Sequence, residues 1–368
     1  MAARALRRLV RPALVLAAAV AGCGDAPGSP KAPAPSFALG VVANTQDEDT
    51  AAEHDSVRRL GVRWLREELR WSEIEPRRGT FDDRRYDRLV TLAARRGIRI
   101  LPLLYLTPGW LSPEPRGLPP SLSAWGRYVE HVVRRYGPGG TFWRTHPELD
   151  GRLAMRTFEV WNEPYLAYFS TGGIRPARYA QLVRSSIEAG RRAKADVAFL
   201  ASMETEYHDD AGTPRNWAQD VFAADPGLGK LLGGVAVHPY SQVGPADRSG
   251  PRRSQFARIE DILTTIRRNK VTTRAPLWIT ELGWSTCSAR PACVDRDDQR
   301  RYWADALRLT REGTLRPAVG GLFVYSLHDL GAAEPDDPLG SFGLLGPDGS
   351  RKPAWDVVRE AADAVRRG

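Results

Sequence analysis

Residues 157–164 read TFEVWNEP, a pattern that predicts a buried β-strand ending in an Asn-Glu pair and stopped by proline. A carboxylate at the tip of such a strand is expected to have a specific partner or function, because burying an unpaired charge costs several kcal/mol. Residues 276–284 read PLWITELGW and are built in the same way. If the rest of the chain closes a sheet around them, Glu163 and Glu281 are expected to meet as a pair of carboxylates over its mouth.

Eight apolar stretches alternate with eight helical ones along the chain. The strands are expected at residues 37–43, 62–69, 98–106, 157–164, 197–202, 234–240, 276–284 and 321–328. The helices are expected at about residues 49–60, 83–96, 123–136, 175–195, 213–223, 253–269, 297–312 and 354–367. Near-continuous apolar strands are typical of parallel sheets covered by helices, and the count predicts an α/β fold of the (β/α)8 TIM-barrel type. An open doubly wound sheet is the alternative, but no glycine-rich phosphate loop follows the first strand.

The first 36 residues have the pattern of a targeting segment and a tether. Arginines at positions 4 to 11 precede an apolar run, residues 13–21, which is too short to span a membrane as a mature helix. The run ends in VAGC at residues 20–23, which resembles the bacterial lipobox. We therefore expect a lipoprotein signal peptide at residues 1–22, lipidation of Cys23 and a flexible Pro/Ala/Gly tether at residues 23–36. An ordinary secretory signal with an incidental cysteine is the alternative.

This interpretation leaves residues 37–368 as a single domain outside the cytoplasm. The protein is then anchored by lipid to the outer side of a bacterial cell membrane, or secreted. In such an oxidising compartment, Cys287 and Cys293, six residues apart, are expected to form a local disulfide. A metal site there is disfavoured because no His pair or third cysteine lies nearby at ligand spacing.

The charge of the chain looks at first like that of a nucleic-acid-binding protein. The formal charge is +9 and the pI is about 9.7. Four of these charges lie on arginines of the leader, which leaves +5 on the mature chain. The other arginines are interleaved with Asp and Glu along the expected helices, which is typical of solvated helix faces. Nucleic acid is therefore not expected as a partner.

Polar side chains stand where the expected strands end. They are Arg66, Asn162, Glu163, His238, Tyr240, Glu281 and His328. Glu163 and Glu281 are separated by three βα units of about forty residues, so their strands lie roughly across a barrel mouth from each other. In barrel enzymes this face carries the chemistry. The spacing therefore predicts that both carboxylates converge on one substrate.

Several motifs give this chain a resemblance to known enzymes. WNEP at residues 161–164 and ITELGW at residues 279–284 resemble the two catalytic signatures of clan A glycoside hydrolases. The closest similarity is to family thirty-nine and to exopolysaccharide-active endoglycosidases described broadly as cellulase-like. It extends over nearly the whole mature chain, through WSEIEP (71–76), TPGW (107–110), HPY (238–240) and FGLL (342–345).

The resemblance implies a retaining β-glycoside hydrolase with two glutamates in different roles. Glu163 would be the general acid/base, and Glu281 the nucleophile. One carboxyl group must be protonated to release the leaving group, while the other stays ionised to attack the anomeric carbon. Asn162 would hydrogen-bond the sugar 2-hydroxyl. Arg66 and Tyr240 would hold Glu281 ionised and oriented.

The remaining expectations concern support and substrate. His238 is given a supporting role, and Trp284 is a candidate platform for a sugar ring. Many clan relatives carry a Trp at the end of strand eight, where this chain offers Tyr325 or His328. The expected partner is a polysaccharide or oligosaccharide, and no metal or cofactor is implied. A non-catalytic carbohydrate-binding lipoprotein on the same scaffold is the alternative function.

Overall fold

The computed structural model describes residues 37–43, 50–251, 255–289, 291–330 and 336–367. These residues belong to a single compact unit that begins at Pro35. The predictions for the signal peptide, for Cys23 and for the tether fall on residues 1–36, which lie outside the described residues. They stay predictions.

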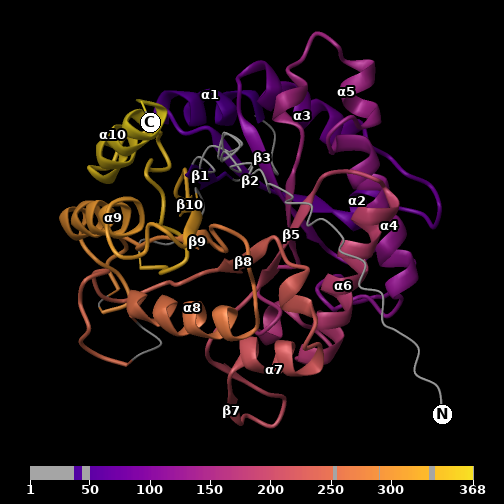
Figure 1. Cartoon of the computed structure of the whole chain (residues 1–368). Coiled ribbons are helices and arrows are strands. Elements are labelled where there is room, and N and C mark those ends of the chain that lie inside the picture. The colour runs from indigo at the N-terminus through magenta and orange to yellow at the C-terminus, as the bar shows by residue number, and fades with distance from the viewer. Residues whose placement is uncertain (1–36, 44–49, 252–254, 290, 331–335, 368) are drawn as a thin grey trace, which may run out of the picture. The chain divides into compact units, whose positions relative to one another are not determined.

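Eight parallel strands close into a barrel, so the predicted fold is confirmed (Figure 1). The order around the barrel is β1, β2, β3, β4, β5, β8, β9 and β10, with β10 returning to pair with β1. The strands are β1 (Ala38–Val42), β2 (Trp64–Arg70), β3 (Arg99–Tyr105), β4 (Thr157–Val160), β5 (Ala198–Ser202), β8 (Gly234–Val237), β9 (Leu277–Leu282) and β10 (Val319–Tyr325). The two strands that carry the predicted carboxylates, β4 and β9, are three places apart in this order.

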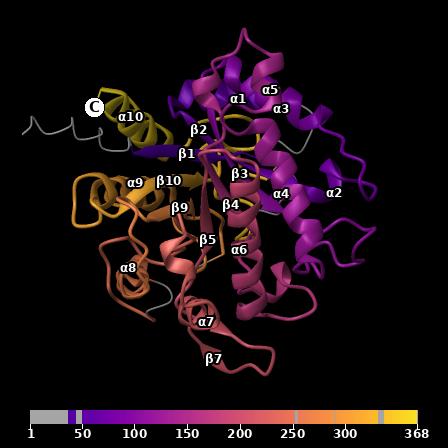
Figure 2. The same cartoon turned by 45° about the vertical axis from the view of Figure 1, so that its right-hand side comes forward.

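Helices surround the barrel on its outside (Figures 1 and 2). The main ones are α1 (Thr50–Leu60), α3 (Arg84–Arg95), α4 (Leu122–Tyr136), α6 (Pro176–Arg192), α7 (Trp217–Ala224), α8 (Ile259–Arg268), α9 (Arg296–Arg311) and α10 (Ala354–Arg367), with α2 (Trp71–Ile74) and α5 (Thr141–Thr145) as single turns. Local signals begin several of them: Ser121 and Asp295 accept hydrogen bonds from the first-turn amides of α4 and α9. Each described helix is too short or too polar to cross a membrane.

Two predicted helices begin later than expected. The helix predicted at residues 213–223 starts only at Trp217, because Pro214–Arg215 (β7) pairs with Tyr207–His208 (β6) in a small hairpin. Asn216 then caps α7 by accepting a hydrogen bond from the amide of Gln219. Similarly, the helix predicted at residues 253–269 becomes regular only at Ile259, after a 3-10 turn at Phe256–Arg258.

Large apolar side chains fill the lower part of the barrel interior. Leu101, Leu200, Ala236 and Phe323 form a buried cluster there, against which Trp64 and Trp278 pack. Gly40 of β1 leaves the space that Phe323 needs, since a Cβ at this position would lie 2.4 Å from its ring. Above this apolar layer, toward the carboxyl ends of the strands, the interior side chains are charged.

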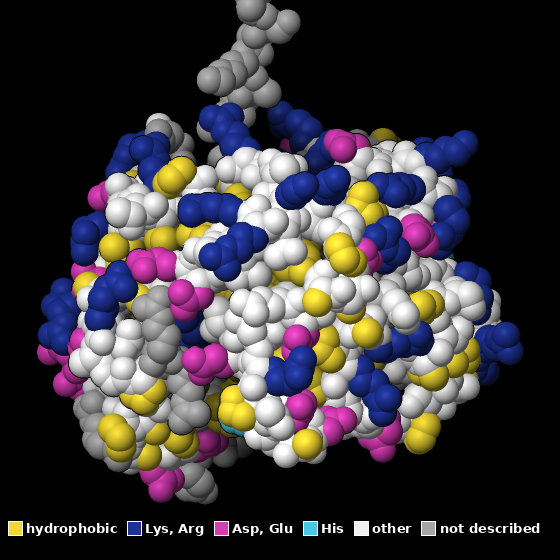
Figure 3. All heavy atoms as spheres, turned by 60° about the horizontal axis from the view of Figure 1, so that its bottom comes forward, with side chains coloured by type: hydrophobic (Ala, Val, Ile, Leu, Met, Phe, Trp, Pro, Cys, Tyr) yellow, Lys and Arg dark blue, Asp and Glu magenta, His cyan; other side chains and the backbone are white. Residues whose placement is uncertain are grey.

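Outside the barrel, charged side chains are distributed rather than clustered. Figure 3 shows Lys and Arg scattered over one face, with Asp, Glu and apolar side chains between them. Many of these arginines lie within ion-pair distance of a carboxylate on the same or a neighbouring helix, for example Arg134 with Glu130 and Arg184 with Asp225. Such pairs agree with the solvated helix faces expected from the sequence.

Candidate active site

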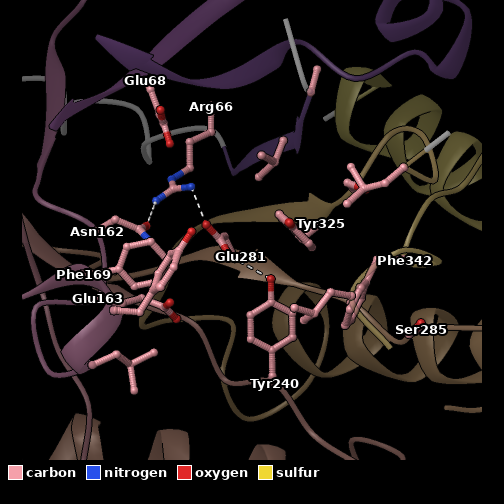
Figure 4. Close-up of a pocket in the computed structure, with 18 of the residues that line it drawn as sticks. Arg66, Glu68, Asn162, Glu163, Phe169, Tyr240, Glu281, Ser285, Tyr325 and Phe342 are labelled. Atoms are coloured by element: carbon pink, nitrogen blue, oxygen red, sulfur yellow. Dashed lines mark hydrogen bonds and ion pairs between the residues drawn. The ribbon is translucent and has the colours of Figure 1, made fainter. Parts of the chain in front are cut away.

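The carboxyl ends of the strands surround a pocket of about 1070 Å³. Its walls come from the strand ends and from the loops that follow β3, β4, β8, β9 and β10. Glu163 and Glu281 both line it, together with Arg66, Asn162, Tyr240 and Tyr325 (Figure 4). The two glutamates thus share a single cavity.

Glu281, near the end of β9, has both carboxylate oxygens engaged by donors. Nη1 of Arg66 donates to Oε1 at 2.6 Å, and the hydroxyl of Tyr240 donates to Oε2 at 2.8 Å (Figure 4). Burial, and then the nearby charge of Glu281, raise the pKa of Tyr240 well above its usual value, so this phenol stays a donor. A cation and a neutral donor on opposite oxygens hold the orientation of the Glu281 carboxyl group.

Glu163 follows β4 on a turn that leaves the strand sharply. Trp161 and Glu163 have φ values of 63° and 38°, in the left-handed region that L-residues rarely occupy. This turn ends the strand at Val160, earlier than the sequence suggested. On Oε1, Glu163 meets Nδ1 of His238 at 2.9 Å and the hydroxyl of Tyr165 at 3.4 Å. Strained backbone of this kind is concentrated at functional sites.

The separation of the two carboxylates can be bounded through His238. Its Nδ1 lies 2.9 Å from Oε1 of Glu163 and 3.6 Å from Oε2 of Glu281. These distances limit the separation of the two oxygens to about 6.5 Å, where retaining glycosidases have about 5–5.5 Å and inverting ones about 6.5–9.5 Å.

His238 sits among three carboxylates. Its Nε2 is 3.0 Å from Oγ1 of Thr280, which donates in turn to Oε1 of Glu159 at 3.1 Å. Burial alone would lower the pKa of His238, but Glu281, Glu159 and Glu163 together raise it to about 10. The imidazole is therefore protonated at neutral pH, and both of its nitrogens act as donors.

Glu159 is a part of the site that the sequence reasoning missed. It is fully buried inside β4, and Arg66 forms a fork with it: Nε to Oε2 at 2.6 Å and Nη2 to Oε1 at 3.1 Å. Burial alone would raise its pKa, but Arg66 and His238 lower it to about 2. A signal was present, because a Glu within an otherwise apolar strand is costly to bury without a partner.

Arg66, in β2, donates hydrogen bonds to three other residues of the site. Beyond its bonds to Glu159 and Glu281, its Nη2 donates to Oδ1 of Asn162 at 2.9 Å. Burial alone would lower the pKa of Arg66, but Glu159 and Glu281 raise it above its usual value. Because the carbonyl oxygen of Asn162 accepts from Arg66, its amide NH2 is the group left to meet a ligand. Figure 4 shows Asn162 beside Glu163 on one wall of the pocket.

The predicted aromatic residues divide between pocket and core. Tyr325 lines the pocket and meets Tyr240 and Phe342 edge to face. Trp284 also borders the pocket, but it is only 2% exposed, because Tyr302 and Trp303 pack against its ring. The ring of Trp284 therefore offers little surface as a sugar platform.

His328 lies at the rim of the pocket, on the side of β1. Its Nε2 is 3.2 Å from a carboxylate oxygen of Glu53 in α1. The aromatic surface that does face the pocket includes Tyr168 and Phe169, which the sequence reasoning did not single out. Only the folding of the loops after β3 and β4 shows that these rings reach the cavity.

The predicted disulfide between Cys287 and Cys293 is present, with a Cα–Cα distance of 5.4 Å. It closes the loop after β9, and residues of this loop, among them Ser285, Ala292 and Val294, line the pocket. The bond thus restrains the wall next to Glu281. Within the described ranges, no group of three His, Cys, Asp or Glu has the arrangement of a metal site.

A scan against protein-family models and a search of curated proteins find no match for the chain. Solved structures do resemble it. One is a family 39 glycoside hydrolase from Bacteroides cellulosilyticus WH2, with a TM-score of 0.63, 19% identity and coverage of 88% of this chain. A GH5_18 protein from Streptomyces cattleya in complex with GlcNAc has a TM-score of 0.64, 20% identity and 90% coverage. A monomeric β-xylosidase from Caulobacter crescentus CB15 has a TM-score of 0.63, 21% identity and 88% coverage.

This chain spans 63%, 81% and 67% of the lengths of those three proteins, in the same order. At these identities the similarity establishes a common fold. The neighbours are barrels named as glycoside hydrolases, and they include family 39, which the motifs of this chain resemble.

Proposed function

We propose that this chain is a retaining β-glycoside hydrolase that cleaves O-glycosidic bonds in a polysaccharide or oligosaccharide by double displacement. The observation that carries the proposal is the pairing of Glu163 with Glu281 across one pocket, with an oxygen separation of at most about 6.5 Å. The names of the structural neighbours, a β-xylosidase and an exo-β-1,4-mannosidase among them, support the same class of reaction.

In the first step Glu281 attacks the anomeric carbon. Arg66 and Tyr240 each donate a hydrogen bond to its carboxylate and so fix its orientation for the attack. Glu163 gives its proton to the leaving oxygen, and a covalent glycosyl-enzyme forms on Glu281. Asn162, whose carbonyl oxygen is held by Arg66, turns its amide toward the sugar, where it can donate to the 2-hydroxyl.

In the second step Glu163 works as a base. Having lost its proton, it accepts one from the water that attacks the anomeric carbon and releases Glu281. His238 supports the stage between the two steps, because its Nδ1–H donates to the Glu163 carboxylate that exists there while Glu281 is esterified.

A decisive experiment uses 2-fluoro glycosides of several sugar configurations, each carrying a dinitrophenyl leaving group. Such compounds accumulate the covalent intermediate, and peptide mass spectrometry should find the label on Glu281. The Glu281→Ala variant should lose turnover and labelling together. Glu163→Gln should keep labelling with this good leaving group but lose hydrolysis of poorly activated substrates. Wild-type protein that binds glycans and never turns them over would favour the non-catalytic carbohydrate-binding alternative.

We also propose that the enzyme acts outside the cytoplasm, tethered by a lipid on Cys23. The VAGC sequence at residues 20–23 and the Pro-rich stretch after it support this proposal. Full-length protein expressed in a bacterial host should incorporate a palmitate label and sediment with membranes. Cys23→Ala should abolish the label, and a secreted product with an unlabelled Cys23 in the wild type would contradict the anchor.

A further inference from the structure

One arginine that lines the pocket has no carboxylate partner among the described residues, although the lining also includes Glu67, Glu68, Glu163 and Glu281. Three arginines line it, Arg66, Arg70 and Arg116. Arg66 pairs with Glu159 and Glu281, and Arg70 pairs with Glu68 at 2.8 Å. Arg116 has no carboxylate within ion-pair distance among the residues that the structure describes. It lies in the loop between β3 and α4.

Arg116 is nevertheless held in place. Its guanidinium carbon lies 4.4 Å from the centroid of the Tyr168 ring, in the loop after β4. The Tyr168 ring in turn meets Phe169 edge to face at 4.8 Å. Stacking on an aromatic face occupies the plane of a guanidinium and leaves its N–H edge free to donate. Arg116 is therefore positioned as a planar, two-pronged donor at the pocket wall.

Tyr105 supplies a second, independent observation. It is the last residue of β3, only 3% exposed, and its ring packs against Trp161 at 5.0 Å. Its hydroxyl is buried and makes no hydrogen bond of standard geometry in the structure. Such a group costs free energy unless a ligand pairs with it. Burial and Glu68 raise the pKa of Tyr105 above its usual value, so the hydroxyl keeps its proton.

The two donors belong to one subsite. Arg116 is near enough to Tyr105 for its charge, and a weak contact of its guanidinium with the phenol oxygen, to oppose the rise in the pKa of that phenol. Both line the same cavity as Glu163, on the side where Figure 4 shows Phe169 beside Asn162. Glu68, the carboxylate nearby, is already paired with Arg70. Arg116, with no carboxylate within ion-pair distance among the described residues, thus lies beside a phenol whose hydrogen has no acceptor.

We propose that Arg116 and Tyr105 form a subsite for the carboxylate of an acidic sugar, so that the substrate is a uronate-containing glycan. A carboxylate accepts two parallel hydrogen bonds from a guanidinium edge and has a lone pair left for the phenol. It would also give Arg116 a carboxylate partner. The inference rests on the proposed glycosidase function, since it places the acidic sugar in the pocket of Glu163 and Glu281.

Binding is tested on the Glu163→Gln variant, in which turnover is suppressed, by isothermal titration. The probes are four uronate polymers, glucuronoxylan, alginate, polygalacturonate and hyaluronan, each paired with a sample whose carboxyl groups have been reduced to alcohols. At least one polymer should bind about tenfold or more tightly than its reduced partner, as expected for loss of a charge-assisted hydrogen bond. If none of the four pairs differs tenfold, the proposal is overturned.

Matched variants in the same background locate the effect. Arg116→Gln should remove the preference for the carboxylated polymer, whereas Arg144→Gln, which deletes an exposed arginine of α5 outside the pocket, should keep it. Tyr105→Phe should weaken binding and change the melting temperature little, because the deleted hydroxyl makes no hydrogen bond of standard geometry within the protein. A preference that survives Arg116→Gln overturns the assignment.

The two proposals can fail separately. Wild-type protein that hydrolyses neutral aryl glycosides yet shows no preference within any polymer pair overturns the acidic-sugar subsite alone. Protein that prefers uronate polymers but leaves them and all aryl glycosides uncleaved overturns the hydrolase function and retains the subsite.

Discussion

Replacing Glu159 with glutamine tests whether the buried ion network holds the barrel together. The substitution keeps the shape of the side chain but removes the charge that faces Arg66 and His238. In the folded protein the pKa of Glu159 falls from 4.5 to about 2, which corresponds to about 3 kcal/mol of stability at neutral pH. Removal of one partner from a buried pair typically costs about 3–5 kcal/mol, in agreement.

Urea denaturation at several pH values measures this effect. With a slope of about 3 kcal/mol/M, the midpoint of Glu159→Gln at pH 7 should lie about 1 M below that of the wild type. A carboxylate whose folded pKa is lowered stabilises the protein above its unfolded pKa, and that stabilisation is lost as the pH falls. The difference between the two proteins should therefore be full above about pH 5 and shrink toward pH 2.

Glu130→Gln is the matched control. Glu130 also pairs with two arginines, Arg134 and Arg192, but it lies at the surface between α4 and α6. Its replacement should cost about 1 kcal/mol or less, because water screens the pairs. Equal midpoints for Glu159→Gln and the wild type at pH 7, or a difference that grows on acidification, would refute the reasoning.

Three further predictions follow from the same contacts. His238→Gln should lower the melting temperature most below about pH 6.5. The difference in melting temperature between variant and wild type should disappear as the pH rises through about 10, where the wild-type imidazolium loses its proton. Melting curves recorded across this pH range measure the difference. Lys352→Met should lower the free energy of unfolding, measured by urea denaturation, by about 3–5 kcal/mol. The Lys352 ammonium lies 2.7 Å from the buried carboxylate of Asp329, which the substitution leaves without its cation. A loss no larger than that of an exposed ion pair would contradict this prediction. The double variant Cys287→Ser/Cys293→Ser should lose about 2 kcal/mol of unfolding free energy, because the disulfide no longer restrains the unfolded chain. Chemical reduction of the wild type should lower its unfolding free energy by the same amount, and a reduced wild type as stable as the oxidised one would contradict the prediction.

The sequence predicted the barrel because that information is local. Short apolar runs such as residues 98–106 and 197–202 indicate buried strands, and the amphipathic stretches between them indicate helices. The sequence-based prediction of a helix was wrong at residues 213–216. There Pro214–Arg215 pairs with Tyr207–His208 in a hairpin, which no local sequence pattern indicated. Pairing of two-residue strands depends on the surrounding structure more than on their own propensity.

The site was predictable to the same degree. Glu163 and Glu281 could be singled out because polar residues at the tips of apolar strands are costly and collect on one face of a barrel. The two hydrogen bonds from Arg66 to Glu159 could not be predicted in this way. They cross the barrel interior between β2 and β4, two strands that are not neighbours in the sheet.

By itself the sequence determined the alternation of strands and helices, and with it which polar side chains would stand at the carboxyl ends. Only the tertiary structure decided how these side chains are charged and paired. It placed His238 among three carboxylates and left Arg116 with none within ion-pair distance among the described residues. The physical reason is the distance over which each effect acts. Periodicity relates residues a few positions apart in the sequence, whereas the pKa and pairing of a charged side chain depend on the groups that the closed barrel brings within a few ångströms of it.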